Sequence, residues 1–178
     1  YFWLGDLAQA APWFAQVLEL GTQIPRMQRQ RYLPSDPLVL CCLQWAWAQA
    51  LLGQQSSAVK AMERAVGLVS ESDASVQDRV ILDVFSILLC DLLGATDMRR
   101  VHIVNARARA ECEGFDFWLA LTACYEALQA AEDGVATSVD GFPEHYEKVL
   151  EHHPSAAPLA WWPAARAFLA AGDATRAL

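Results

Sequence analysis

The chain has 178 residues, of which 54% are apolar and 19% charged, and this composition excludes an intrinsically disordered protein. Its 13 basic and 21 acidic side chains give a net charge of −8, which disfavours nonspecific binding to nucleic acid or to anionic lipid. The uncharged stretch from Pro37 to Val59 contains only about 15 mostly apolar residues, whereas a membrane-spanning helix needs about 20. We therefore expect neither nucleic acid nor membrane as a partner.

The pattern along the chain is helical throughout. Apolar residues recur at spacings of three and four, and no run of alternating β-branched residues is present. Breaks rich in glycine, proline and serine separate these segments. The sequence predicts an all-α protein with no sheet. In chain order we expect a first helix over residues 5–20, helix pairs over about 37–70, 75–113 and 115–153, and a last helix over 157–171.

One short turn pattern recurs along the chain, and its copies stand between 35 and 48 residues apart, which excludes a strict 34-residue repeat. Five residues after each turn, where the two helices of a pair cross, four of the five residues are small. We therefore predict a degenerate array of antiparallel helix pairs. The turns are Leu4-Gly5-Asp6, Leu52-Gly53-Gln54, Leu93-Gly94-Ala95, Leu128-Gln129-Ala130 and Ala171-Gly172-Asp173, and the crossing residues are Ala10, Ala58, Arg99, Gly134 and Ala177.

The segment from Trp118 to Tyr125 has the order W-x-x-L-G-x-x-Y of a tetratricopeptide first helix, with threonine in place of glycine. Trp161, Ala164, Ala165 and Phe168 give the same order in the next repeat. Further short segments are Asp36-Pro37, Leu51-Leu52-Gly53 with Ala58, Glu113-Gly114-Phe115, Phe117-Trp118-Leu119-Ala120 and Glu132-Asp133-Gly134-Val135.

On these residues the chain resembles a divergent tetratricopeptide array. More narrowly, it resembles the helical-repeat region downstream of the ATPase module in bacterial adenylate cyclases and LuxR-type transcription regulators. The resemblance implies a single array over residues 1–178, a right-handed superhelix of antiparallel pairs, that is, a TPR-like α-solenoid. Arg99 departs from the pattern at a normally small position. Gly141-Phe142-Pro143 also departs from it, and we expect the helix there to kink or restart at Pro143.

The repeat register also predicts that the chain is a fragment of a longer protein, beginning with an orphan helix. We expect this helix to present Leu7, Phe14 and Leu18, and the last helix to present Trp161, Trp162 and Phe168. Because repeat arrays need polar terminal caps to stay soluble, the sequence predicts self-association through these ends.

Catalytic and cofactor motifs are absent: the sequence has no GxxxxGK, GxGxxG, GxSxG or HExxH. We predict no catalytic residue, no cofactor and no enzymatic activity for this chain. His145, His152 and His153 with neighbouring glutamates are interpreted as a charged solvent face rather than a metal site.

The basic group Arg26, Arg29 and Arg31 is either a solvated loop or a contact for phosphates or an acidic partner. The five cysteines have apolar neighbours and no CxxC spacing, which predicts core residues in a reducing cytoplasm.

The resemblance implies an inner groove lined by the first helix of each pair. The residues assigned to it are Leu40, Leu43, Trp47, Leu88, Asp91, Asp116, Leu119, Glu126, Trp162 and Arg166. This surface suits an amphipathic helix or an extended peptide, and packing on the neighbouring repeat is the alternative for the same residues.

The resemblance implies a non-catalytic regulatory protein-interaction module of a larger signalling or transcription-regulating ATPase. Its partner would be a peptide, a subunit or its own catalytic domain. The alternative is a sensor domain for a small effector molecule that controls an attached ATPase or DNA-binding domain. A deep pocket favours the sensor, whereas an open groove favours the interaction module.

Overall fold

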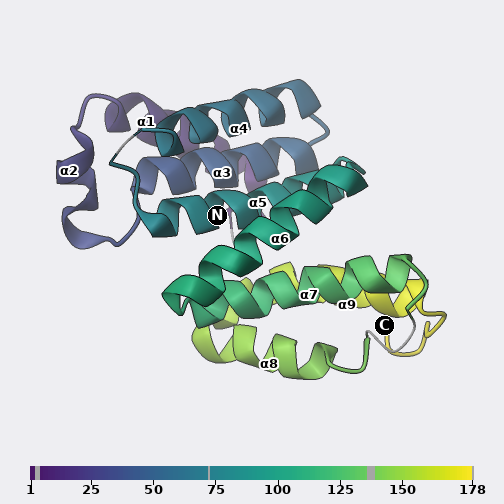
Figure 1. Ribbon diagram of the computed structural model, residues 1–178. Helices are drawn as coiled ribbons and strands as arrows, with labels where there is room; N and C mark the ends of the chain where they lie inside the picture. The colour runs from purple at the N-terminus through teal and green to yellow at the C-terminus, as the bar shows by residue number, and fades with distance from the viewer. Residues whose placement is uncertain (3–4, 72, 136–138, 178) are drawn as a thin grey trace. The chain divides into compact units, whose positions relative to one another are not determined.

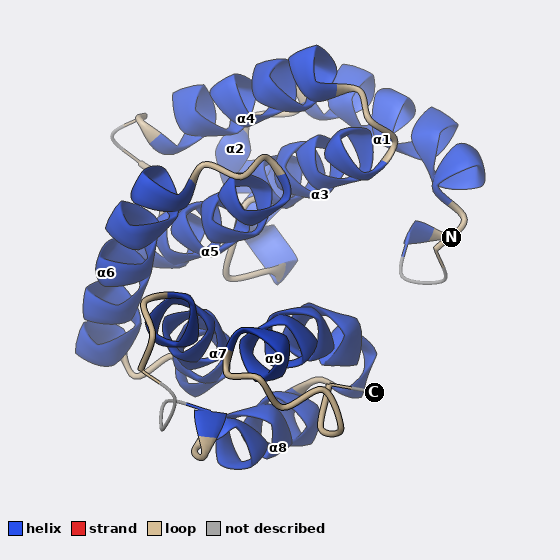
Figure 2. Cartoon of the chain, turned by 90° about the vertical axis from the view of Figure 1, so that its right-hand side faces the viewer, coloured by secondary structure: helices blue, strands red, loops and turns tan. Residues whose placement is uncertain are grey.

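The computed structural model describes residues 1–2, 5–71, 73–135 and 139–177 (Figure 1). Over these residues every regular element is a helix and no strand occurs (Figure 2), which confirms the all-α prediction. Leu4 of the first predicted turn lies outside the described residues. None of the described helices combines the length and the apolar character needed to cross a bilayer. The chain separates into two compact units, residues 1–99 and residues 100–178.

Unit 1 is built around α3 (Pro37–Leu51), which packs against α1 (Leu7–Gly21), α4 (Gln55–Val69) and α5 (Val76–Leu92) (Figure 1). Because α3 has neighbours on several sides, it is apolar nearly all round and contains no charged residue. A short helix, α2 (Arg26–Arg29), and a 3-10 turn, η2 (Gln30–Tyr32), connect α1 to α3.

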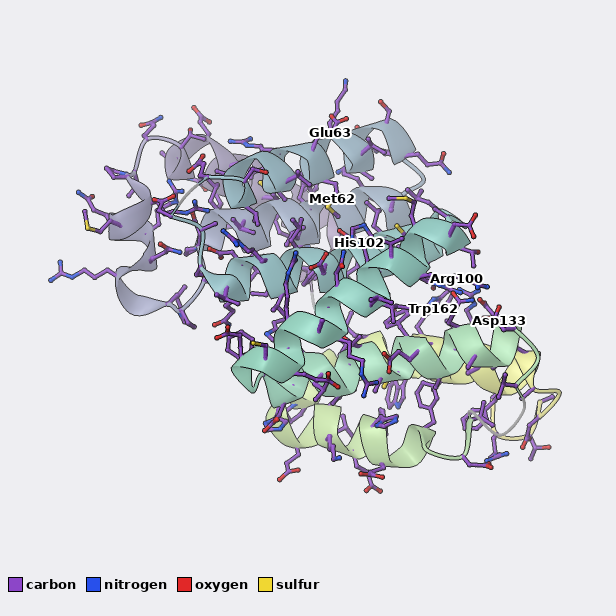
Figure 3. All side chains as sticks on the ribbon, viewed as in Figure 1. Met62, Glu63, Arg100, His102, Asp133 and Trp162 are labelled. Carbon is purple, nitrogen blue, oxygen red and sulfur yellow. The ribbon has the colours of Figure 1, made fainter. Side chains whose placement is uncertain are left out.

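Unit 2 is built around α7 (Asp116–Glu132), which packs against α8 (Phe142–His152) and α9 (Ala157–Ala170) (Figure 1). The boundary between the units falls inside α6 (Thr96–Glu113), and a 3-10 turn, η4 (Pro154–Ala156), precedes α9. Helix α8 begins at Phe142 with Pro143 in its first turn, which agrees with the expectation that a helix starts at this proline. Arg100 of α6 lies 2.5 Å from Asp133 in the turn after α7 (Figure 3).

The helices α3, α5, α7 and α9 all end two residues before a glycine with positive φ, namely Gly53, Gly94, Gly134 and Gly172. After each glycine the next amide donates to the carbonyl five residues before it, as from Gln54 N to Gln49 O at 2.8 Å. This is the Schellman motif, which requires left-handed backbone at one residue and therefore favours glycine there. The four glycines thus provide a common reference point, called here the glycine register, from which positions in the helices of both units can be compared.

The turn predicted at Leu128-Gln129-Ala130 is wrong, because these residues lie inside α7, which continues to Glu132. Leucine, glutamine and alanine are strong helix formers, and the left-handed residue that ends this helix is Gly134. Gly134 is therefore the turn itself and not a small residue at a helix crossing. Five residues after it stands Val139, which is buried.

This error shifts the predicted register of α7 by five residues. With Gly134 and Gly172 as the reference points, Trp118 and Trp161 no longer stand at equivalent positions of α7 and α9. Arg99, the other departure from the pattern, is buried and forms an ion pair with Asp91.

The cysteines divide into a buried and an exposed set. Cys41, Cys42 and Cys124 are buried, and burial raises the pKa of their thiols to about 12, about 11 and about 12. Cys90 is half-buried, whereas Cys112 is exposed. The core interpretation is confirmed for the three buried cysteines and is wrong for Cys112.

The buried carboxylate of Asp36 connects several segments of unit 1. It accepts hydrogen bonds from Arg26 Nε at 3.1 Å, from Arg29 Nε at 2.8 Å and from its own helix at Leu38 N at 2.9 Å. The backbone amide of Asp36 donates to the carboxylate of Asp78 at 2.7 Å, and Asp78 with Ser75 forms the capping box of α5. Asp36 therefore joins the N-termini of α3 and α5 to the connection between α1 and α3.

The two arginines extend this network to the other helices. Arg26 donates to Asp73 at 2.9 Å and to the carbonyl of Leu68 at the end of α4 at 2.8 Å. Arg29 donates to the carbonyl of Gly21 at the end of α1 at 3.0 Å. The basic group is thus no solvated loop at Arg26 and Arg29, because both side chains are committed to internal partners.

We predict that Asp36→Ala lowers the free energy of unfolding by about 3 to 5 kcal/mol, because it removes one partner of a buried ion pair together with a helix cap. Asp73 also binds Arg26 but is largely exposed, so Asp73→Asn should cost less than about 1 kcal/mol. Urea denaturation of both variants measures the difference. Equal effects would show that Asp36 has no special role.

The network also predicts a pH dependence. Burial alone would raise the pKa of Asp36, but hydrogen bonds from Arg29 and Leu38 and the charges of both arginines outweigh it and lower this pKa below its ordinary value. Because the folded-state pKa is the lower one, the stabilisation is present above about pH 4 and is lost as the pH falls through the folded-state pKa. The cost of Asp36→Asn, measured by urea denaturation, should therefore shrink from pH 7 to pH 3. A constant cost would contradict this account.

The glycine register predicts opposite effects of the same substitution at two positions of unit 1. Gly53→Ala should destabilise the protein by about 1 to 2 kcal/mol, because Gly53 has φ +75°. Gly67 lies inside α4 with open space around it, so Gly67→Ala should stabilise by about 0.5 to 1 kcal/mol. Thermal and urea unfolding give both values, and destabilisation by both substitutions would refute the prediction.

Candidate binding grooves

Unit 1 carries an apolar groove between α1 and α3, called here the α1/α3 groove. Its volume is about 410 Å³, and none of the described residues that line it is charged. The lining residues are Tyr1, Phe2, Ala10, Trp13, Phe14, Val17, Leu33, Ser35, Pro37, Leu40, Cys41 and Gln44. A second hollow of about 480 Å³ shares Trp13, Val17 and Pro37 with it and continues along α1 to Leu20 and Ile24.

The repeat register relates this groove to a space that is filled by a helix elsewhere in unit 1. Helices α1 and α4 are equivalent, since each has 15 residues and begins two residues after a positive-φ glycine, Gly5 or Gly53. Helices α3 and α5 are likewise equivalent, because each ends two residues before its glycine. Helix α3 lies between α4 and α5 and packs against both. Since α1 corresponds to α4 and α3 corresponds to α5, the α1/α3 groove corresponds to the space that α3 fills one repeat later.

Burial of equivalent residues supports this comparison. On α4 the residues Ala61 and Ala65 are buried. Their equivalents on α1 are Trp13 and Val17, which are 56% and 43% exposed. A surface that is covered by a helix in one repeat is therefore open in the other.

Unit 2 carries a charged hollow of about 580 Å³, called here the α7/α8 cleft. Its apolar lining residues belong to α7, and charged side chains of both signs complete the lining. The lining residues are Arg107, Asp116, Leu119, Ala120, Ala123, Glu126, His145, Lys148, Glu151 and His152.

Several charges of the cleft are already paired. Arg107 forms ion pairs with Glu126 and, at 2.8 Å, with Glu111. The charge of Glu126 is the main reason that the pKa of Arg107 is raised. Lys148 pairs with Glu144 at 2.8 Å. Among the described residues no group of three or more His, Cys, Asp or Glu side chains is arranged to hold a metal ion.

The ten predicted groove residues lie in different environments. In unit 1, Leu43, Leu88 and Asp91 are buried, whereas Leu40 and Trp47 are half-buried. Of these five, Leu40 lines the α1/α3 groove. Burial of the other side chains favours packing on the neighbouring helix.

In unit 2 the structure brings Asp116, Leu119 and Glu126 together in the α7/α8 cleft. These three residues were assigned in the shifted register of α7. The residues of α7 that are equivalent to the predicted positions of α3 and α5 are Leu121, Cys124, Leu128 and Ala131, and all four are buried.

The last two predicted residues lie on α9. Trp162 is half exposed, and the guanidinium of Arg166 lies 5.9 Å from the centre of its indole ring. Arg166 also lies 2.5 Å from Glu132 at the end of α7. Arg166 is therefore engaged within its own unit.

Sequence reasoning missed the residues that form the α1/α3 groove. It expected Phe14 and Leu18 on the open face of the first helix, but both are buried, and the open face carries Trp13, Val17 and Leu20. Comparison of α1 with α4 in the glycine register would have revealed this, because Trp13 and Val17 stand where α4 has two alanines. The expectation for Phe168 is also wrong, since this residue is buried.

Comparison of the chain with protein-family models, with curated proteins and with solved structures found no match.

Proposed function

We propose that the chain is a non-catalytic interaction module whose α1/α3 groove binds one helix of a protein partner. The observation that carries this proposal is the repeat equivalence: the matching space between α4 and α5 holds the helix α3. The α1/α3 groove corresponds to this space and is lined mostly by apolar side chains, so it is suited to another helix.

The chemistry of the groove specifies the kind of helix. Since the described lining of the groove is uncharged, a charge on the contacting face of the bound helix would be buried without an opposite charge, at a large cost. The contacting face should therefore be uncharged. Exposed Trp13 is suited to anchor it, because large aromatic side chains carry much of the binding energy of protein interfaces.

The sequence is the basis for proposing the superhelical arrangement, the regulatory role and the cellular compartment of the module. The resemblance to helical-repeat regions of bacterial regulators supports a right-handed superhelix and a regulatory role beside an ATPase. The absence of CxxC spacing supports the cytoplasm. The absence of catalytic motifs supports a non-enzymatic role.

A second candidate function is recognition of a small effector molecule in the α7/α8 cleft. It is favoured by the volume of this cleft, which is in the range of ligand sites, and by a lining that combines charged groups of both signs with two alanines. A small molecule that carries both an acidic and a basic group would match these walls.

The interaction proposal is tested with a synthetic peptide of residues 36–52, which contains the α3 sequence, flanked by lysines for solubility and labelled with fluorescein. Fluorescence anisotropy should show saturable binding to the full chain with a Kd of about 10 μM, roughly −7 kcal/mol. A peptide of residues 55–69, the α4 sequence, serves as the control and should not bind.

Two matched variants locate the binding surface. Val17→Glu places a carboxylate in the groove and should weaken binding at least about tenfold. Val59 has the same 43% exposure on α4 and lines neither hollow of α1, so Val59→Glu should leave the affinity unchanged. Absence of binding, or equal binding to both variants, would refute the proposal.

A further inference from the structure

We infer that the helix bound in the α1/α3 groove is α9 of a second copy of this chain. This inference rests on the function proposed for the groove and names its partner. The contact is heterologous, because it joins two different surfaces of two identical chains.

Helix α9 is the equivalent of α3 in the glycine register, since α3 ends two residues before Gly53 and α9 two residues before Gly172. Both helices are nearly free of charge: α3 has no charged residue, and α9 has only Arg166. Among the helices outside unit 1, α9 thus combines the register and the composition that the groove requires.

The open face of α9 matches the covered face of α3. Cys42 and Ala46 of α3 are buried, whereas their equivalents on α9, Trp161 and Ala165, are 57% exposed and half-buried. A hollow of about 430 Å³ lies beside this face, lined by Trp161, Ala164, Ala165, Arg176 and Ala177.

The opposite face of α9 already has neighbours. Leu159, Ala160 and Ala167 are buried, and α9 packs against α7 and α8. The helix is therefore formed and oriented before it meets a partner, so that association costs little conformational entropy.

The side chains of the two faces complement each other when α9 runs antiparallel to α1, as α3 does to α4. In this order Trp161 occupies the place opposite Val17, and Trp13 occupies the place opposite Ala165. Each tryptophan then enters a hollow of the other chain, Trp13 beside Ala164 and Ala165, and Trp161 beside Val17. Because both faces carry a tryptophan, the two helix axes should lie further apart than those of α3 and α4.

Charge supports the same pairing. The residues that the structure describes along the groove are uncharged, and so are the contacting residues Trp161, Ala164 and Ala165. Arg176 at the rim of the α9 hollow is held by Asp173 at 2.5 Å, so its charge is compensated within its own chain. No charge has to be buried without a partner.

A complementation experiment with the full chain tests this inference. Sedimentation velocity of the unmodified chain between 1 and 100 μM should show association that increases with concentration. Val17→Glu blocks the groove and Trp161→Glu blocks α9, and each variant alone should be monomeric over this range. An equimolar mixture should form dimers and nothing larger, because it contains one intact groove and one intact α9 face for each pair of chains.

Control measurements distinguish misfolding of a variant from failure of this inference and from failure of the proposed function. Val59→Glu should associate like the unmodified chain, and circular dichroism checks that the variants fold, as expected for substitutions at exposed positions. A monomeric unmodified chain at 100 μM, or a mixture that stays monomeric, would overturn the inference. Association of Trp161→Glu alone would also overturn it, because grooves would then bind each other face to face. The α3 peptide titration repeated on monomeric Trp161→Glu reports on the groove itself, so the proposed function can survive when this inference fails.

Discussion

The arrangement of unit 1 depends on the buried carboxylate of Asp36. A single negative charge cannot be held away from water without partners, and here two arginines and the amide of Leu38 supply them. The arginines in turn bind carbonyls at the ends of α1 and α4, while the Asp36 amide reaches the cap of α5. Five segments therefore meet at one charged network, and the positions of α1 and α3, which form the groove, follow from it.

A second constraint sets the lengths of the helices. Each of α3, α5, α7 and α9 stops where a glycine permits left-handed backbone and a Schellman hydrogen bond. This common ending makes the helices comparable residue by residue, although their sequences differ. In the same way Gly5 and Gly53, which precede α1 and α4, align these two helices, and the aligned positions are buried in α4 but exposed in α1.

The two hollows differ in chemistry for a local reason. In the α1/α3 groove the described lining is uncharged and mostly apolar, and in the neighbouring connection Arg26 and Arg29 pair with Asp36. The lining of the α7/α8 cleft includes Ala120 and Ala123 together with charged side chains of α6, α7 and α8. The first therefore suits an uncharged helix, and the second a small polar molecule.

The sequence by itself determined the helical class, four of the glycine turns and the core position of Cys41, Cys42 and Cys124, because helical periodicity and left-handed turns are local properties. It did not determine where α7 ends, since Leu128, Gln129 and Ala130 favour a helix more strongly than the repeat pattern favoured a turn. Only the tertiary structure decided the partners of Arg26 and the open face of α1. Asp36 and Asp78 are 42 residues apart in sequence, and Arg26 and Asp73 are 47 apart, so no local pattern connects them. Which stripe of α1 is buried likewise depends on α3, whose packing covers Phe14 and Leu18 and leaves Trp13 and Val17 open.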